Sequence, residues 1–247
     1  MWEPIGKIIE LKLLNEADIH INALKIRTST NFDVLPDISN LELVNQEEIS
    51  NFKTAKRAEE HAAGRYLLHQ MLLRYFPSIK CGFVEILRDE NRAPYFNWID
   101  TTYHGMPLPN FSISTSGNFV VVAICESNYN VGIDVEKYNQ IRSVNLFDFL
   151  SSDSELIELK KLCEIHGNKK INIIWTIKES ILKALRLGMS ISPTKIKILD
   201  NNSKFKKVIE YKGSKFNLKN QIINFDEEYS FSIAYQKNIG KMSLRCG

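Results

Sequence analysis

The 247-residue chain lacks several features that would tie it to a membrane or to nucleic acid. No apolar run approaches the length of a membrane-spanning helix. The N-terminal stretch MWEPIGKIIELKLL carries Glu3 and Glu10 and has no long apolar core, which argues against a secretory signal. The net charge is only +3, too small to indicate a dedicated nucleic-acid binder. We therefore expect a cytoplasmic protein with no membrane or nucleic-acid partner.

Cysteine is also sparse and widely spaced. No two cysteines form a CxxC pair, and no histidine lies near one at ligand spacing; the four are Cys81, Cys125, Cys163 and Cys246. This spacing disfavours both a zinc site and a disulfide framework. Free thiols in a reducing cytosol are the expected state.

What is present is the composition of a folded globular protein, with 44% hydrophobic and 25% charged residues. Hydrophobic periodicity and turn residues divide the chain into segments. The expected order is a strand over 6–14, a long amphipathic helix over 50–75, a strand over 83–87, a loop over 88–109, a hairpin over 111–125, a strand over 131–137, helices over 144–165 and 171–187, and short strands at KIKIL, KVIEY, KFNLK, YSFSIAY and KMSLR.

This order of elements repeats loosely, because a strand, helical segments and further strands occur in each half of the chain. We predict an α+β fold of two similar subdomains in a pseudo-twofold arrangement, each a small, mostly antiparallel sheet packed with a long helix. The polar segment SNYN, residues 127–130, marks the expected boundary. It divides the chain into subdomains 1–128 and 129–247.

Two carboxylates interrupt the apolar strand VGIDVEK, residues 131–137. Side chains two apart in a strand share a face, so Asp134 and Glu136 are neighbours, while Ile133 and Val135 face a core. Neighbouring carboxylates repel each other unless a cation lies between them, and Mg²⁺ prefers such oxygen ligands. The alternative is a solvent-facing strand end, with Lys137 and a nearby arginine as partners.

A second group of polar residues occurs in the helical segment WTIKESILKAL, residues 175–185. Glu179 and Lys183 are four residues apart and share one helix face. By itself this spacing is that of an ordinary helix salt bridge. It also supplies a third carboxylate and a lysine that could face the ligand of Asp134 and Glu136.

Taken together, these two segments resemble the signature motifs of the phosphopantetheinyl transferase superfamily, (V/I)G(I/V)D followed by WxxKE(S/A)xxK. The length and the similar first half resemble the Sfp type, in which two similar subdomains form one chain. Further similarity lies in KRAEEHAAGRYLL at 56–68, NRAP at 91–94 and FSISTSG at 111–117. The resemblance extends over roughly residues 50–195.

The resemblance implies transfer of 4′-phosphopantetheine from coenzyme A to a serine of an apo carrier protein, with release of 3′,5′-ADP. It implies that Asp134, Glu136 and Glu179 hold Mg²⁺ on the coenzyme A diphosphate. Glu179, or a water that it orients, would accept the serine proton, and Lys183 would stabilise the phosphate or the departing oxygen.

The same resemblance implies a set of coenzyme A contacts in the first half of the chain, and these are Lys53, Arg57, Arg65, Arg92, Ser114 and Thr115. A solvated basic helix face is the alternative for the cations on the long helix, and Lys56 could replace Lys53 or Arg57. His61 and His69 are expected to be structural or surface groups. The family usually has histidine where this chain has Thr115, so we expect weaker coenzyme A binding.

Two other functions remain open from the residues alone. One is a Mg²⁺-dependent phosphohydrolase, and the other is a non-catalytic module that binds coenzyme A or a carrier protein through a degenerate site. The intact set of acids and lysine argues against degeneracy. Fatty-acid, polyketide and peptide-synthetase carriers all present a similar serine, so the sequence does not select an acyl or a peptidyl carrier. Two fused halves make a monomer sufficient.

Overall fold

The computed structural model describes residues 2–13, 16–27, 37–44, 48, 51–139, 146–166, 170–200 and 202–238. The strands are β1 (Ile9–Glu10), β2 (Ile19–Lys25), β3 (Val84–Arg88), β4 (Pro94–Trp98), β5 (Asn110–Ser116), β6 (Phe119–Cys125), β7 (Tyr129–Lys137), β8 (Val208–Tyr211), β9 (Ser214–Asn224) and β10 (Glu228–Lys237). The helices are α2 (Ala55–Tyr75), α3 (Leu146–Leu150), α4 (Asp153–His166) and α5 (Lys170–Leu185).

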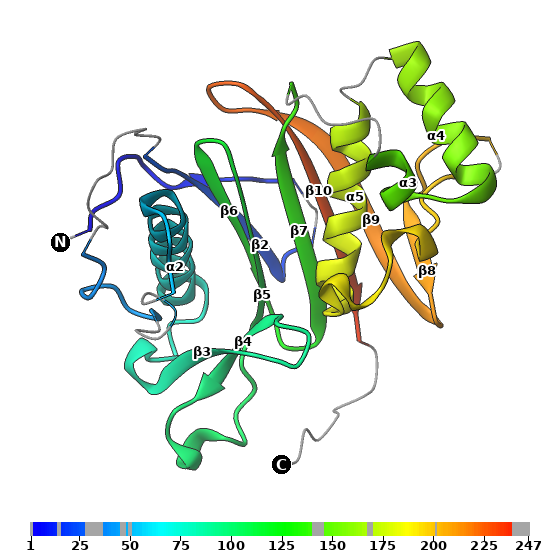
Figure 1. The fold of residues 1–247 in the computed structure, drawn as a ribbon. Coiled ribbons are helices and arrows are strands. Elements are labelled where there is room, and N and C mark those ends of the chain that lie inside the picture. Colours follow the sequence, from blue (N-terminus) through cyan, green and yellow to red (C-terminus); the bar gives the residue numbers. More distant parts are fainter. Residues whose placement is uncertain are drawn as a thin grey trace.

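Two four-stranded antiparallel sheets form the middle of the molecule, with strand orders β1-β2-β6-β5 and β7-β10-β9-β8. Helix α2 covers the outer face of the first sheet and α5 the outer face of the second, while the inner faces pack on each other (Figure 1). The layers therefore run helix, sheet, sheet, helix. The predicted α+β architecture of two similar halves is confirmed.

The central core between the sheets is built from alternate strand residues, as the period of two requires. Val121 and Ala123 of β6 face Ile133 and Val135 of β7 in one cluster of buried side chains. The prediction that Ile133 and Val135 enter a core is thus confirmed. The residues between them on β7 face α5.

Strands β5 and β7 meet along a seam of serine side chains. Alternate serine hydroxyls of β5 accept hydrogen bonds from alternate backbone N–H groups of β7 at 3.1–3.2 Å, and the pairs are Ser112 with Ile133, Ser114 with Val135 and Ser116 with Lys137. The donors are backbone groups that would otherwise be buried without partners. Side chains thereby join the two sheets where the strands share no backbone ladder.

Two strand predictions in the first half are wrong. The expected strand over 6–14 is reduced to Ile9–Glu10, and the unpredicted β2 takes a central place in the sheet. The expected loop over 88–109 contains β4, which begins at Pro94. Proline is tolerated as the first residue of a strand, so the nearby Pro and Gly residues concealed a short strand.

Helix boundaries also differ from those predicted. Helix α2 begins at Ala55, five residues late, where Thr54 Oγ1 accepts a hydrogen bond from the Arg57 N–H as an N-cap. The single helix expected over 144–165 is broken into α3 and α4 at Ser151–Ser152. Serine and aspartate at this point favour caps over helix interiors, which accounts for the break.

In the C-terminal third, KFNLK lies within the longer strand β9 and YSFSIAY within β10, while KVIEY lies largely in β8. KIKIL instead contains the end of a 3₁₀ turn and an isolated bridge from Leu199 to Phe205. KMSLR lies outside the described residues. Over the part of the chain that the structure describes, none of the helices combines the length and hydrophobicity needed to cross a bilayer.

Candidate active site at the junction of β5, β7 and α5

The position of α5 against β7 depends on Gly132. A Cβ atom at residue 132 would overlap the backbone of α5 at Ser180 and Ala184. Glycine therefore allows the helix to lie directly on the strand. This close packing brings the α5 side chain Lys183 to the strand residue Asp134.

Asp134 is the centre of the site and is only 5% exposed. Its Oδ1 atom accepts hydrogen bonds from Ser114 Oγ at 2.7 Å and from Lys183 Nζ at 2.8 Å. Its Oδ2 atom is buried and has no hydrogen-bond partner among the described residues. A buried carboxylate oxygen left in this way is costly unless positive charge can approach it.

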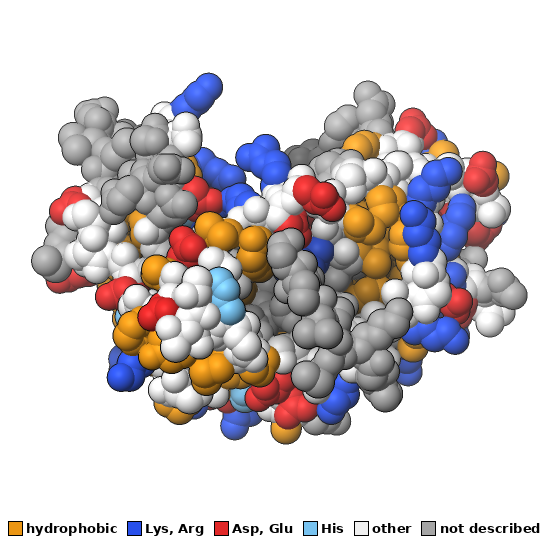
Figure 2. Space-filling view, turned by 90° about the horizontal axis from the view of Figure 1, so that it is seen from below, with side chains coloured by type: hydrophobic (Ala, Val, Ile, Leu, Met, Phe, Trp, Pro, Cys, Tyr) orange, Lys and Arg blue, Asp and Glu red, His pale blue; other side chains and the backbone are white. Residues whose placement is uncertain are grey.

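The other two predicted acids lie on the two elements that meet at Asp134, Glu136 on β7 and Glu179 on α5. Glu136 is partly buried, and its Oε2 accepts a hydrogen bond from Ser116 Oγ at 2.8 Å. Glu179 lines a cavity of about 240 Å³ together with Lys183 and Arg92. Basic side chains also gather at a notch between two lobes of the molecule (Figure 2).

The donor set is suited in kind to a hard divalent cation. Over the described ranges, no three histidine, cysteine, aspartate or glutamate side chains lie close enough to form a ready-made metal cluster. The Oδ2 atom of Asp134 nevertheless provides an open, buried, negatively charged oxygen. Because Mg²⁺ keeps several waters or phosphate oxygens, it needs few ligands from the protein.

Lys178, for which the sequence predicted no role, anchors α5 through residues that do not line the cavity. It is fully buried, and its Nζ donates to Glu155 Oε2 at 3.0 Å, Pro193 O at 3.2 Å and Ile196 O at 2.7 Å. Burial lowers the pKa of Lys178, although the nearby charge of Glu155 acts in the opposite direction. Burial also opposes ionisation of Glu155, but Lys178 and the hydrogen bond from Ser151 hold the pKa of this carboxyl below its ordinary value. We conclude that both groups are charged, because Nζ has three oxygen acceptors.

This anchored pair fixes the rotation of α5 about its axis. A buried charge must keep its partners, so turning the helix would be costly. Glu179 follows Lys178 directly and Lys183 lies a turn further on. In the sequence, Lys178 stands among the apolar residues Ile173, Ile174, Ile177 and Ile181. This context could have indicated that its side chain is buried.

The predicted coenzyme contacts on α2 form a separate group. Lys53, Lys56 and Arg57 are exposed near the start of the helix. Glu60 Oε2 lies 3.0 Å from Arg57 and Glu60 Oε1 lies 3.8 Å from Lys56. These contacts are surface ion pairs, which a phosphate can displace at little cost.

Arg65 differs from the other α2 cations because it is only 3% exposed. Its Nη2 donates to Glu48 Oε2 at 3.0 Å, while Nε and Nη1 are buried with no partner among the described residues. Glu48 also accepts from Arg88 Nε at 2.6 Å. The alternative of a solvated basic face is therefore wrong for Arg65.

The two polar residues predicted on β5 lie on opposite sides of the strand. Ser114 is buried, and its two hydrogen bonds are to Asp134 and to the backbone of Val135. Thr115 is partly exposed and shares its face of β5 with Ile113, which packs near Gly64 of α2. Thr115 thus faces the α2 side, and Ser114 belongs to the carboxylate site.

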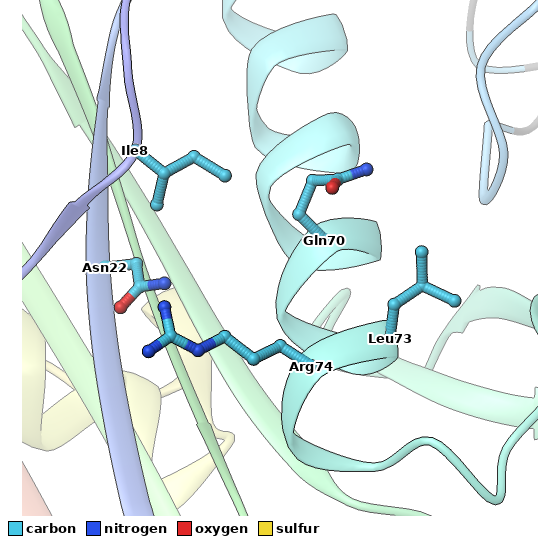
Figure 3. A pocket seen from close by; sticks show the side chains of 5 residues that line it. All are labelled: Ile8, Asn22, Gln70, Leu73 and Arg74. Atoms are coloured by element: carbon cyan, nitrogen blue, oxygen red, sulfur yellow. The ribbon is translucent and has the colours of Figure 1, made fainter.

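A second cavity, of about 370 Å³, lies between β2 and α2 (Figure 3). Asn22 of β2 and Arg74 of α2 point toward each other across it, and Asn22 Oδ1 is buried without a partner among the described residues. None of the predicted site residues lines this cavity.

Known protein families match the two segments of the chain that contain the predicted site residues. Residues 130–234 match the family described as the 4′-phosphopantetheinyl transferase superfamily, and residues 28–127 match that described as 4′-phosphopantetheinyl transferase, N-terminal. The chain belongs to the phosphopantetheinyl transferase superfamily. A curated relative, 4′-phosphopantetheinyl transferase gsp of Aneurinibacillus migulanus, is 27% identical over 185 residues, which is 75% of this chain and 68% of that protein.

Phosphopantetheinyl transferases act on carrier proteins and use coenzyme A as the substrate. Within this transferase, the match over 130–234 contains β7 and α5 and so carries Asp134, Glu179 and Lys183. The match over 28–127 contains α2 and β5. Both groups of predicted residues therefore lie in segments that match the superfamily.

Proposed function

We propose that the protein transfers 4′-phosphopantetheine from coenzyme A to a serine of an apo acyl or peptidyl carrier protein, with Mg²⁺, and releases 3′,5′-ADP. The observation that carries the proposal is Asp134, whose Oδ1 is held by Lys183 and Ser114 while its buried Oδ2 stays open. Family membership supplies the reaction class. The carboxylates offer oxygen ligands for the Mg²⁺ that would neutralise the charge of the diphosphate.

Asp134, Glu136 and Glu179 are the residues proposed to hold Mg²⁺. The bound ion would neutralise the developing negative charge on the diphosphate. Ser114 and Ser116 hold one oxygen of Asp134 and one of Glu136 by hydrogen bonds. Asp134 thereby keeps its buried second oxygen, Oδ2, for a cation.

The chemical step makes one bond and breaks one. The carrier serine oxygen bonds to the phosphorus next to pantetheine, and the bond from that phosphorus to the bridging diphosphate oxygen breaks. Glu179, on the cavity wall, accepts the serine proton directly or through a water. Lys183 holds positive charge beside the departing oxygen of 3′,5′-ADP.

The nucleotide end of coenzyme A is assigned to the basic groups of the first half. Lys53, Arg57 and Arg92 are exposed cations that can meet phosphate oxygens. Arg65 has two N–H groups without partners and could bind phosphate in competition with Glu48. If Thr115 faces the same phosphate, Thr115→His should tighten coenzyme A binding, measured by isothermal titration.

The test of the reaction is the intact mass of an apo carrier protein after incubation with the protein, coenzyme A and Mg²⁺. We expect a gain of the phosphopantetheine mass that EDTA abolishes. Asp134→Asn should slow the reaction by about 10²-fold or more, because one charged group of the site is lost. Glu210→Gln is the control, since Glu210 is an exposed acid paired only at the surface with Lys215.

The other outcomes separate the alternatives. Coenzyme A binding without modification of fatty-acid, polyketide or peptide-synthetase carriers would overturn the catalytic proposal in favour of a binding module. Release of phosphate without a carrier would indicate a phosphohydrolase. Absence of coenzyme A binding would contradict the proposed function altogether.

A further inference from the structure

Helix α5 ends in a backbone geometry that normally favours glycine. The N–H of Arg186 donates to Lys183 O at 3.0 Å and the N–H of Leu187 donates to Leu182 O at 3.3 Å, the paired bonds of a Schellman motif. Arg186 occupies its left-handed position with φ +57°. A side chain there is unfavourable relative to glycine, so the arginine calls for a compensating interaction.

The guanidinium of Arg186 reaches across to the first half of the chain. Nη1 donates to Pro94 O at 3.1 Å, and Nη2 donates to Asp89 Oδ2 at 3.0 Å and to Ala93 O at 3.3 Å. Its Cζ also lies 5.8 Å from the centroid of the Tyr95 ring. One side chain from α5 therefore contacts the turn that joins β3 to β4 at several points.

Asp89 organises that turn from within. Its Oδ1 accepts from the N–H groups of Asn91 at 3.1 Å and Ala93 at 2.9 Å, which leaves Oδ2 for Arg186. The turn also approaches the residues after α5 closely, because a Cβ on Gly188 would lie 3.0 Å from Asn91 O. Gly188 permits this approach, and the hydrogen bonds of Arg186 stabilise it.

Residues of this contact line the same cavity as Glu179 and Lys183. Arg92 from the turn and Arg186 from the end of α5 both line this cavity of about 240 Å³. The two walls come from different halves of the chain. Their separation therefore depends on contacts between the halves.

We propose that Arg186 is a positioning residue that ties the 89–94 turn to the catalytic helix and so sets the width of the coenzyme A cavity. The inference rests on the proposed function for the identity of the ligand. The tie itself rests on the contacts of Arg186 with Asp89, Ala93 and Pro94. Arg186 acts through the turn and does not itself take part in the chemical step.

Arg186→Gly isolates the guanidinium, because glycine suits the left-handed position and preserves the helix end. We expect the KM for coenzyme A to rise about tenfold or more, the scale of losing charge-assisted hydrogen bonds, while kcat at saturating coenzyme A changes less than about threefold. The dissociation constant from isothermal titration should rise with KM. Arg186→Lys should recover only part of the affinity, because an ammonium cannot span the same acceptors.

Lys212→Gly is the matched control. Lys212 also has a left-handed backbone, with φ +48°, but it lies in the turn between β8 and β9. Removing its side chain relieves the same kind of strain at a residue that does not line the cavity. KM and kcat should both stay at the wild-type values.

Hydrogen exchange measured by mass spectrometry tests the tie independently of activity. Amides of the 89–94 turn should exchange faster in Arg186→Gly than in wild type or Lys212→Gly. Unchanged KM and unchanged exchange would overturn the inference, as would an equal fall in kcat with no change in KM. If wild type binds no coenzyme A, the proposed function fails, whereas faster exchange would still establish the tie between the halves.

Discussion

Ser114 shows how one hydroxyl serves both the fold and the site. Its Oγ accepts from the N–H of Val135 and donates to Asp134 Oδ1. Ser112 makes the same kind of backbone contact, with Ile133, but among the described residues it contacts no carboxylate. The two serines share the backbone contact and differ in the bond to Asp134, although Ser112 also lines the cavity of Glu179 and Lys183.

We predict that Ser114→Ala lowers the free energy of unfolding by about 1–3 kcal/mol, because the buried N–H of Val135 loses its acceptor. Its kcat should fall as well, since Asp134 loses one of the two bonds that orient it. Ser112→Ala should lower stability by a similar amount with kcat retained. Urea unfolding and the carrier-modification assay measure the two effects, and equal kcat values in both variants would contradict the orienting role.

The lowered pKa of His61 leads to a separate prediction about how the free energy of unfolding depends on pH. Burial chiefly, and then the charge of Arg65, lowers the pKa of His61 to about 4 in spite of Glu48. The unfolded chain binds this proton near pH 6.5 while the folded chain does not, so the free energy of unfolding should fall as pH drops from 6.5 to 4. The loss should reach up to about 3 kcal/mol.

His61→Gln should reduce the slope of that part of the pH profile in urea titrations, and a smaller slope should remain because burial also lowers the pKa of His20 and of His69. Glu48, whose pKa the neighbouring arginines keep below its ordinary value despite burial, titrates at lower pH. A wild-type stability that is flat between pH 6.5 and 4 would refute the assignment.

At the scale of elements, the contact between β7 and α5 decides the geometry of the site. The helix lies directly on the strand at Gly132, and its buried Lys178 is held by Glu155. Lys183 then reaches Asp134 from the helix while Ser114 reaches it from β5. The site exists because three elements converge on one side chain.

Gly132→Ala should move α5 away from β7, because the added methyl group would overlap backbone atoms of the helix, which cannot rotate away as a side chain can. We predict a loss of stability of about 3 kcal/mol or more, at the high end for overpacking, together with loss of carrier modification as Lys183 leaves Asp134. Thermal unfolding and the mass assay provide the measurements. Gly82→Ala is the control, since a Cβ there meets nothing within 4 Å; wild-type activity in Gly132→Ala would contradict this account.

At the scale of the molecule, both sheets contribute to one central core. Buried residues from β2 and β6 pack directly on those from β7, β9 and β10. The serine seam joins the same two sheets at β5 and β7. Neither sheet could keep its inner face covered if the other unfolded.

The two halves should therefore unfold in one cooperative transition. Variants that retain only Trp98, in the first half, or only Trp175, in the second, with the other tryptophans changed to Phe, report on each half separately. Their fluorescence midpoints in urea should coincide with each other and with far-ultraviolet circular dichroism. Separate midpoints would show that the halves are independent domains, with the predicted boundary at 128/129 as a folding boundary.

The sequence by itself determined the parts of this protein that depend on local pattern. Alternation in VGIDVEK placed Asp134 and Glu136 on one face and Ile133 and Val135 on the other, because strand side chains alternate. Helical spacing placed Glu179 and Lys183 together on α5. The paired motifs identified the family, and the fold of that family implied two similar subdomains, each with its own sheet.

Only the tertiary structure decided which distant residues meet. No local pattern could reveal that Lys183 binds Asp134, that β5 joins β7 through serine hydroxyls, or that Arg186 ties α5 to the 89–94 turn. The same holds for β2, whose central place depends on pairing with β6 more than on its own alternation. Such contacts join residues far apart in the chain, and they form only when packing of the sheets and helices brings their elements together.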